Sequence, residues 1–346
     1  MKAILINNDN KGAEKLYIGD APKPKPAKDE VLVKIRAFGL NRMDILQREG
    51  QYPVPPGASH ILGVEFAGTV EELGSGVNNW SVGDEVLGLA TGGAYAEYIA
   101  IGTGFLLPKP SGMPWEVAAG IMENYITAYQ ALVTIAKIKE GDNVLIHTGA
   151  SGVGTAALQI AKSFHAKRIF TTASSEEKLG FLHKLIGDNE LLHTINYKKE
   201  DFEKHIMDAT NKYGVDVLVD FVGQSHWNKN LGSLARDGRM VMLGLLSGLD
   251  VEKTSLGPIL FKRLQITGST LRSRSPEYQM NLVQNFGKDV FPHIVEQAFG
   301  NQGNGKRDAI QVVMHAVYSM EDIVKAHQDM ESDASVGKIV VTVPTE

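Results

Sequence analysis

The chain contains no cysteine among its 346 residues. This absence excludes disulfide bonds, thiolate nucleophiles and every zinc site that uses cysteine ligands. No stretch of the sequence approaches the roughly 18–20 consecutive apolar residues that a membrane-spanning helix requires. The amino terminus becomes polar at Asn7, before a secretory apolar segment is established. We therefore expect a cytoplasmic protein that does not insert into membranes.

A strong excess of charge is also absent. The chain has 35 Lys and Arg against 40 Asp and Glu, a formal net charge of −5 and a pI near 6.1. This balance argues against a general affinity for nucleic acid or for anionic membranes. Hydrophobic residues make up 43% of the chain and charged residues 22%, which permits a large buried core. At ~150 residues per domain, the length suggests about two domains.

The sequence changes character near residues 115–122. Before this point, short β-type runs are separated by glycine-containing turns, at residues 31–35, 68–73, 85–89 and 94–99. Beyond it, helical patterns alternate with apolar strands, at residues 143–147, 168–172, 215–221, 240–245 and 264–268. This alternation predicts an α/β fold with a parallel sheet covered on both faces, next to a β-rich domain. Residues 301–305 are the best candidate for a mobile loop.

A glycine-rich loop, Gly149-Ala150-Ser151-Gly152-Val153-Gly154, lies between an expected strand and an expected helix over residues 155–164. In this context the loop predicts a pyrophosphate site, because small residues let the backbone approach the ligand and the helix N-terminus favours negative charge. Ser151 occupies the place of the middle glycine, so the fingerprint is incomplete and a tight turn without a ligand is the alternative. A serine hydrolase is disfavoured, because Val153 occupies a position where that motif requires glycine.

The acidic residue that usually binds an adenosine ribose about 20 residues further on is missing. The strand over residues 168–172 runs into Ala173-Ser174-Ser175, and Lys178 follows. Small hydroxyls and a lysine suit a 2′-phosphate better than a bare ribose. The alternative is that Ser174 or Ser175 caps a helix, and the two interpretations are compatible. Glu176 and Glu177 weaken the case for a phosphate.

Long motifs in a fixed order resemble the zinc-free quinone oxidoreductases of the medium-chain dehydrogenase/reductase superfamily. The motifs that carry this resemblance are Leu40-Asn41-Arg42-Met43-Asp44, Gly50-Gln51-Tyr52, Pro55-Pro56-Gly57-Ala58-Ser59, Ser151-Gly152-Val153-Gly154-Thr155, Asn196-Tyr197-Lys198-Lys199, Leu271-Arg272-Ser273-Arg274 and Val336-Gly337-Lys338-Ile339-Val340. Together they extend over most of the chain.

The resemblance implies a Rossmann doubly wound sheet plus a discontinuous, chaperonin-like β-rich substrate domain. The substrate domain would comprise residues 1–122 and 270–346, the cofactor domain residues 123–269, and the active site the cleft between them. The resemblance also implies a homodimer or homotetramer joined through the cofactor domain. Zinc-dependent members carry cysteine and histidine where this chain has Asn41 and Val64, so we expect no metal.

The resemblance also supplies the expected site residues. Tyr52 and Asn41 are the expected catalytic residues, donating hydrogen bonds to the acceptor oxygen. The alternatives are that Tyr52 is only a packed tyrosine and that Asn41 only forms an Asx-turn. Water is the alternative source of the proton. The expected contacts of the cofactor NADPH are Thr127, Ser151, Gly152, Val153, Ser174, Lys178, Tyr197, Phe221, Gly223, Leu243, Leu245, Leu271 and Ser273.

Three functions remain open at this point. The first is hydride transfer from NADPH to a quinone, and the second is NADPH-dependent reduction of the activated double bond of an alkenal or enone. The third is a non-catalytic structural or regulatory role for an NADPH-binding protein. The sequence does not identify the physiological acceptor.

Overall fold

The computed structural model describes residues 1–7, 12–299 and 309–344, so the loop expected at residues 301–305 lies outside the described residues. The chain divides into two compact units. The first unit contains Met1–Ile126, Arg272–Ala298 and Val312–Glu346. The second contains Thr127–Leu271 and a short segment, Phe299–Gln311. The sequence analysis placed the corresponding boundaries after residues 122 and 269, and it did not assign a late segment to the second unit.

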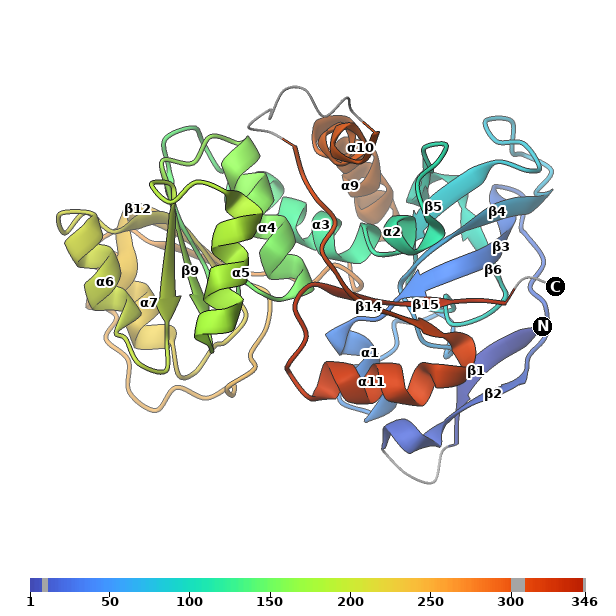
Figure 1. The fold of residues 1–346 in the computed structure, drawn as a ribbon, viewed down its shortest axis with the longest axis horizontal. Coiled ribbons are helices and arrows are strands. Elements are labelled where there is room, and N and C mark those ends of the chain that lie inside the picture. The colour runs from blue at the N-terminus through green and yellow to red at the C-terminus, as the bar shows by residue number, and fades with distance from the viewer. Residues whose placement is uncertain (8–11, 300–308, 345–346) are drawn as a thin grey trace. The chain divides into compact units, whose positions relative to one another are not determined.

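The first unit is built around a mainly antiparallel sheet in the order β14-β15-β3-β4-β5-β7, with β6 paired to β3. Figure 1 shows the red strand β15, from the carboxyl-terminal part of the chain, beside the blue strand β3, from the amino-terminal part. The strands of this sheet are β3 (Glu30–Gly39), β4 (Glu65–Leu73), β5 (Glu85–Leu89), β6 (Tyr98–Gly102), β7 (Leu106–Pro108), β14 (Met314–Ser319) and β15 (Lys338–Thr342).

The remaining elements of the first unit surround this sheet. They are β1 (Lys2–Ile6) paired with β2 (Leu16–Asp20), and the helices α1 (Arg42–Arg48), α2 (Trp115–Ala119), α9 (Pro276–Asp289), α10 (Phe291–Phe299) and α11 (Ile323–Glu331). Helix α3 (Met122–Tyr129) begins in this unit. Apolar side chains of β3, β4 and β15 form the core, in which the Tyr95 ring stacks on Phe38 at 4.4 Å between centroids. This burial is the main contribution to the stability of the unit.

The second unit is a six-stranded parallel sheet in the order β10-β9-β8-β11-β12-β13. Counted along the chain, this is the order 3-2-1-4-5-6 of the doubly wound dinucleotide-binding fold. The strands are β8 (Asn143–Ile146), β9 (Arg168–Ala173), β10 (Leu192–Asn196), β11 (Val215–Asp220), β12 (Leu234–Met242) and β13 (Gln265–Gly268). The fold class expected from the sequence is therefore confirmed.

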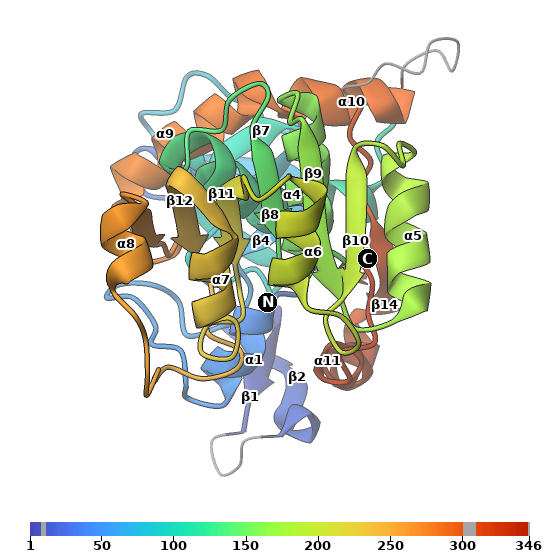
Figure 2. The same cartoon turned by 90° about the vertical axis from the view of Figure 1, so that its left-hand side faces the viewer.

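Helices cover both faces of this sheet, as its apolar strands require. Helices α4 (Gly152–Ser163) and α5 (Glu176–Ile186) lie on one face, and α6 (Phe202–Ala209) and α7 (Trp227–Ser233) lie on the other (Figure 1). Figure 2 shows the strands side by side between these helices, with α8 (Gly257–Phe261) near the β12 end. Helix α3 is followed by a π-helical segment, Gln130–Ile135.

Candidate active site and cofactor site

The glycine-rich loop leaves the carboxyl end of β8 and enters α4 directly. The Ser151 hydroxyl accepts a hydrogen bond from the Gly154 amide at 3.0 Å, so Ser151 is the N-cap and α4 begins at Gly152. A Cβ on Gly154 would lie 2.3 Å from the Thr148 carbonyl oxygen, and one on Gly149 would lie 2.0 Å from the Thr171 hydroxyl. Both positions therefore require glycine for the close packing of strand, loop and helix.

This loop leaves backbone donors available at the N-terminus of α4. Among the described residues, no hydrogen bond is formed by the amides of Gly152 and Val153. The first N–H groups of a helix lack intrahelical partners, and the helix dipole places partial positive charge there. The loop therefore offers a cradle of the right chemistry for a dinucleotide pyrophosphate.

The other expected cofactor residues of the second unit gather at the same edge of the sheet. Ser174 follows β9 and Tyr197 follows β10, two neighbouring parallel strands whose last residues, Ala173 and Asn196, are paired. Phe221 and Gly223 follow β11, and Leu243 and Leu245 follow β12. Because the carboxyl ends of parallel strands meet at one edge, the structure brings these residues together where doubly wound sheets bind ligands.

Helix α5 begins at Ser175, whose hydroxyl accepts a hydrogen bond from the Lys178 amide at 3.3 Å. The capping alternative thus applies to Ser175, which leaves Ser174 outside the helix. Glu176 bonds Asn196 at 2.8 Å and Lys199 at 3.0 Å, so this carboxylate is engaged by other partners. Glu176 is therefore a smaller obstacle to a phosphate beside Lys178 than the sequence suggested.

Three expected cofactor contacts lie near the unit boundaries. Thr127 is the first residue of the second unit, and its buried hydroxyl oxygen has no hydrogen-bond partner among the described residues. Such an orphaned group fits a contact with a polar ligand. Leu271 is buried and ends the main segment of the second unit, whereas Ser273 is exposed and belongs to the first.

Asn41 lies in a buried polar cluster of the first unit, just after β3. Its amide nitrogen donates to Glu65 at 3.0 Å, and its amide oxygen accepts from the Lys338 ammonium at 2.6 Å. Lys338 and Glu65 also form an ion pair, and their side chains are 3% and 0% exposed. The three residues meet because β15, β3 and β4 are neighbours in the sheet. The Asn41 amide is thus held between a fixed cation and a fixed anion.

This donor set does not fit a zinc ion. Asn41 uses its amide oxygen for Lys338, and Val64 is a buried aliphatic side chain with no donor atom. Zinc sites are built from cysteine, histidine and carboxylate ligands, and here an ammonium group contacts the carboxylate and the amide. Among residues 1–7, 12–299 and 309–344, no group of three or more histidine or acidic side chains is arranged to hold a metal.

Tyr52 lies in a loop of the first unit and is partly buried. Burial raises the pKa of its phenol, and the nearby Glu123 carboxyl raises it further. The guanidinium of Arg272 lies 5.8 Å from the centre of the Tyr52 ring. Burial first, and then the charge of Glu65, raises the pKa of Glu123 to about 8. Tyr52 therefore lies near a carboxyl whose pKa is raised and beside a permanent cation.

A second buried network supports the start of α1. The Asp44 carboxylate accepts hydrogen bonds from the backbone N–H of Asn41 at 2.9 Å and from the Tyr95 hydroxyl at 3.0 Å. His327 contacts Arg48 through Nδ1 at 3.1 Å and Tyr95 through Nε2 at 3.3 Å. Arginine only donates, so His327 Nδ1 accepts, Nε2–H donates to Tyr95, and Tyr95 donates to Asp44. The network fixes the position of Asp44 beside Asn41.

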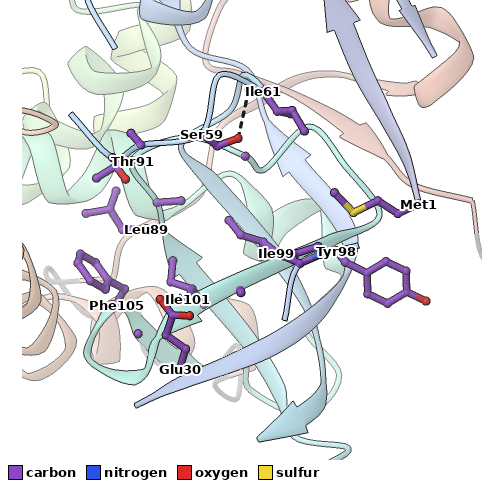
Figure 3. Close-up of a pocket in the computed structure, with 18 of the residues that line it drawn as sticks. Met1, Glu30, Ser59, Ile61, Leu89, Thr91, Tyr98, Ile99, Ile101 and Phe105 are labelled. Carbon is purple, nitrogen blue, oxygen red and sulfur yellow. Dashed lines mark hydrogen bonds between the residues drawn. The ribbon is translucent and has the colours of Figure 1, made fainter. Parts of the chain in front are cut away.

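The first unit also contains a cavity of about 460 Å³. Its lining comes from β6, the loop after β5 and the loop at residues 57–61, and Figure 3 shows Ser59, Leu89, Thr91 and Ile99 around it. The Ser59 hydroxyl accepts a hydrogen bond from the Ile61 amide at 3.1 Å. Neither Tyr52 nor Asn41 lines this cavity, so it is not the expected catalytic site.

Several polar residues of these clusters were not identified from the sequence as site residues. Arg272, Lys338 and Asp44 each lie inside a motif that carried the family resemblance, which is the only signal the sequence offered for them. Glu123 lies in the first turn of α3, and nothing in its sequence neighbourhood distinguished it from an ordinary first-turn acid. His147 of the second unit is fully buried, and its ring nitrogens are bonded to Thr172 and Asn230.

Comparison with known proteins identifies the relatives of this chain. A profile described as an alcohol dehydrogenase GroES-like domain matches residues 27–111, and one described as a zinc-binding dehydrogenase matches residues 152–286. The chain is 28% identical over 340 residues to a synaptic vesicle membrane protein VAT-1 homolog of Rattus norvegicus, covering 94% of this chain and 80% of that protein. It is 27% identical over 344 residues to a quinone oxidoreductase of Rattus norvegicus, covering 99% and 97%.

Solved structures with the same architecture cover nearly the whole chain. An Escherichia coli quinone oxidoreductase complexed with NADPH matches with a TM-score of 0.83 and 28% identity, covering 99% of this chain and 100% of that one. The CurK enoyl reductase matches with a TM-score of 0.83 and 27% identity, covering 99% of each chain. Among the described residues, no helix has the length and apolar character needed to cross a membrane.

Proposed function

Because the chain belongs to the medium-chain dehydrogenase/reductase superfamily, and is thus an oxidoreductase of that family, we propose that it reduces quinones with hydride from NADPH. The observation that carries this proposal is that the expected metal-ligand positions hold Asn41 and Val64, and that the Lys338 ammonium engages both the Asn41 amide oxygen and the Glu65 carboxylate. Oxidation of an alcohol by metal polarisation of its oxygen is therefore unsuited to this site. A quinone already carries conjugated, electron-poor carbonyl groups, so its reduction does not need a Lewis acid.

The residues of the second unit fit NADPH as the cofactor, which supplies the hydride. We propose that the amides of Gly152 and Val153 bind the pyrophosphate, together with the N-cap Ser151. Ser174, Lys178 and Tyr197 would hold the 2′-phosphate, and Thr127 would donate to the nicotinamide portion. The remaining proposed contacts follow β11 and β12 or lie at the end of the unit: Phe221, Gly223, Leu243, Leu245 and Leu271, with Ser273 of the first unit.

We propose that Tyr52 and Asn41 act on the quinone. The Tyr52 hydroxyl has no hydrogen-bond partner among the described residues, so it is available to donate to a quinone oxygen. An amide nitrogen carries two hydrogens, and Asn41 gives one of them to Glu65, which leaves one for the acceptor. Donors fixed in advance stabilise the negative charge that develops on the acceptor oxygen as hydride arrives.

Reduction of an activated carbon–carbon double bond is the second candidate. The similarity to the CurK enoyl reductase, over 99% of the chain, favours this alternative. An enone and a quinone both place negative charge on an oxygen after hydride transfer, so the same donors serve both reactions.

A substrate panel separates these functions. Purified protein is mixed with NADPH and 1,2-naphthoquinone, an alkenal or a cyclic enone, and oxidation of NADPH is followed by absorbance. We expect the highest kcat/KM with the quinone. A higher kcat/KM with the alkenal or enone would favour the second candidate, and NADPH binding without turnover of any acceptor would favour a non-catalytic role.

The choice of NADPH over NADH is tested at Lys178. A hydrogen bond to a charged group is worth about 1.5–3 kcal/mol, so Lys178→Ala should weaken NADPH binding roughly 10- to 150-fold and leave NADH binding nearly unchanged. Lys184→Ala, in the last turn of the same helix α5, is the matched control and should change neither affinity. Equal affinities of the wild type for both cofactors, or equal losses in Lys178→Ala, would refute the assignment.

A further inference from the structure

Arg272 is a buried arginine of the first unit, only 4% exposed. Its Nε donates to the Thr91 carbonyl oxygen at 2.7 Å, and its Nη1 donates to the Gln47 side-chain oxygen at 2.6 Å. Its Nη2 is buried and has no hydrogen-bond partner among the described residues. Two nitrogens of the guanidinium thus hold the group rigidly, and the third presents unused donors.

The charge of Arg272 is also unpaired within the part of the chain that the structure describes. Asp44 and Glu123 are the acidic groups that influence it, but neither forms an ion pair with it. Removing a cation from water without a partner is costly, and an unsatisfied buried donor adds to this cost. A protein tolerates such an arrangement when a ligand supplies the missing acceptor.

The aromatic ring of Tyr52 lies beside this guanidinium, 5.8 Å from its carbon. The Tyr52 hydroxyl, like Arg272 Nη2, has no partner among the described residues. Two donors of different kinds, one charged and one neutral, are therefore available in the same neighbourhood. Their natural ligand is an oxygen that carries negative charge.

We propose that Arg272 is a catalytic residue, whose Nη2 donates a hydrogen bond to the acceptor oxygen on which negative charge develops. This inference rests on the proposed function and names its substrate class, a conjugated carbonyl compound of the quinone or enone type. The acceptor gains the hydride that NADPH loses, NADPH becomes NADP⁺, and the reduced acceptor is left as an oxyanion. Arg272 holds that oxyanion until a solvent proton neutralises it.

This assignment gives the acceptor oxygen a fixed positive charge as its partner. The guanidinium remains protonated although burial lowers its pKa, because the unperturbed value is so high. Its orientation is set before the substrate binds, by Thr91 and Gln47, so little reorganisation is required as charge develops. Lysine cannot reproduce the arrangement, because it lacks the planar fork that makes both anchoring bonds.

The first test compares Arg272→Gln with Arg274→Gln. Arg274 is a matched control in the same segment, and its guanidinium lies 4.9 Å from the centre of the Tyr278 ring. Arg272→Gln should lower kcat for 1,2-naphthoquinone by about 10²- to 10³-fold with an NADPH Kd close to that of the wild type. Arg274→Gln should retain kcat. Added guanidinium ion should restore part of the activity of Arg272→Ala, which a purely structural role would not allow.

The second test needs no turnover. The probe is 4-nitrophenol, because its phenolate form absorbs visible light. Its binding is measured by absorbance at several pH values in the presence of NADP⁺. Wild-type protein should bind the phenolate roughly 10- to 150-fold more tightly than Arg272→Gln, as expected for a charge-assisted hydrogen bond. Thermal unfolding of each variant shows whether it is folded, and Arg272→Lys serves as a second variant if the glutamine variant is not.

The outcomes distinguish the inference from the proposed function. If the wild type reduces quinones and the folded Arg272 variants do so equally well, Arg272 is not catalytic. If NADPH affinity falls in proportion to kcat, Arg272 serves the cofactor and the inference is wrong. If phenolate binding depends on Arg272 but no acceptor is reduced, the oxyanion site stands and the proposed reaction fails. Equal phenolate binding by wild type and variant would show that Nη2 does not bind the oxyanion and would overturn the inference.

Discussion

The hydroxyl of Tyr52 is the most exposed donor of the candidate catalytic cluster and can be removed without changing the shape of the ring. We predict that Tyr52→Phe lowers kcat for the quinone by up to about 10²-fold. This factor corresponds to a loss of ~3 kcal/mol of transition-state stabilisation. NADPH affinity should be unchanged, because Tyr52 and the phosphate loop lie in different units. Steady-state kinetics and a cofactor titration measure the two quantities.

The control for this substitution is Tyr17→Phe, since Tyr17 is 48% exposed on β2 of the same unit. It should leave both quantities unchanged. Wild-type turnover in both Tyr52→Phe and Asn41→Ala would remove these two residues from the catalytic list.

Glu123 should make the stability of the protein dependent on pH. Burial and the neighbouring Glu65 raise its pKa from 4.5 to about 8, so the folded protein keeps a proton that the unfolded chain releases. Between pH 4.5 and about 8 the unfolded state binds fewer protons than the folded state, so the free energy of unfolding falls as pH rises through this range. Above this range neither state holds the proton, and the contribution of Glu123 is level. Glu123→Gln removes this contribution.

Denaturant unfolding of wild type and Glu123→Gln across this pH range tests the prediction. The difference in the free energy of unfolding should shift steadily in favour of the variant up to about pH 8. A comparison of the two proteins at each pH cancels the contribution of other titrating groups such as Asp44. A constant difference across the range would show that Glu123 ionises normally.

The sequence could predict residues from motifs but not their partners. Asn41 and Tyr52 were identified by resemblance, whereas the bond between Asn41 and Lys338 joins residues 297 positions apart. The open donor of Arg272 depends likewise on Thr91 and Gln47, which reach it only through the fold. Charge and hydrogen bonding at these sites come from tertiary structure, which periodicity and spacing do not describe.

At the scale of elements, the buried ion pair of Lys338 and Glu65 joins β15 to β4 across β3. We predict that Lys338→Met destabilises the protein by about 3–5 kcal/mol, because it leaves the Glu65 carboxylate buried without its cation. The double variant Glu65→Gln/Lys338→Met should regain much of this loss, since no uncompensated charge remains. Chemical denaturation of the wild type and both variants measures the effect.

The matched control is Lys325→Met, which removes an exposed ion pair with Asp322 on the first unit. Exposed pairs contribute little, so stability should change by less than ~1 kcal/mol. If Lys338→Met were no more destabilising than Lys325→Met, the buried pair would not hold the three strands together.

Element types were easier to predict than element ends. The apolar strands of the second unit were found because parallel strands covered on both faces are hydrophobic throughout. Helix α4 begins three residues before its expected start, because the Ser151 side chain caps it and Gly152 and Gly154 enter the helix. In the first unit, the strand expected at residues 94–99 is β6 (Tyr98–Gly102), and Ala96 instead forms an isolated bridge with Ala3. Local sequence does not show where pairing partners will be available.

At the scale of the whole molecule, strand β13 ends the order of the parallel sheet, and exposed apolar side chains precede it. Leu256, Leu260 and Phe261 are 69%, 70% and 75% exposed. An open edge and an apolar patch together favour pairing with a second copy of the chain. We predict a homodimer or homotetramer joined through this edge, with the two-fold symmetry usual for such contacts.

Sedimentation velocity at micromolar concentration tests this assembly. The double variant Leu260→Asp/Phe261→Asp should shift the protein toward the monomer. Tyr213→Asp, which changes a tyrosine 56% exposed and outside the patch, should keep the wild-type assembly. A wild-type protein that sediments only as a monomer would contradict the prediction.

Hydride transfer without a metal can be measured in a single experiment. The protein is treated exhaustively with a chelator, its zinc content is determined by elemental analysis, and it is mixed in a stopped-flow instrument with NADPH and 1,2-naphthoquinone. We expect no zinc, an undiminished single-turnover rate of NADPH oxidation, and a slower rate when the transferred hydrogen of NADPH is replaced by deuterium. Loss of NADPH oxidation on chelation, with recovery on adding one equivalent of zinc, would contradict metal-free transfer at the Tyr52 and Asn41 site.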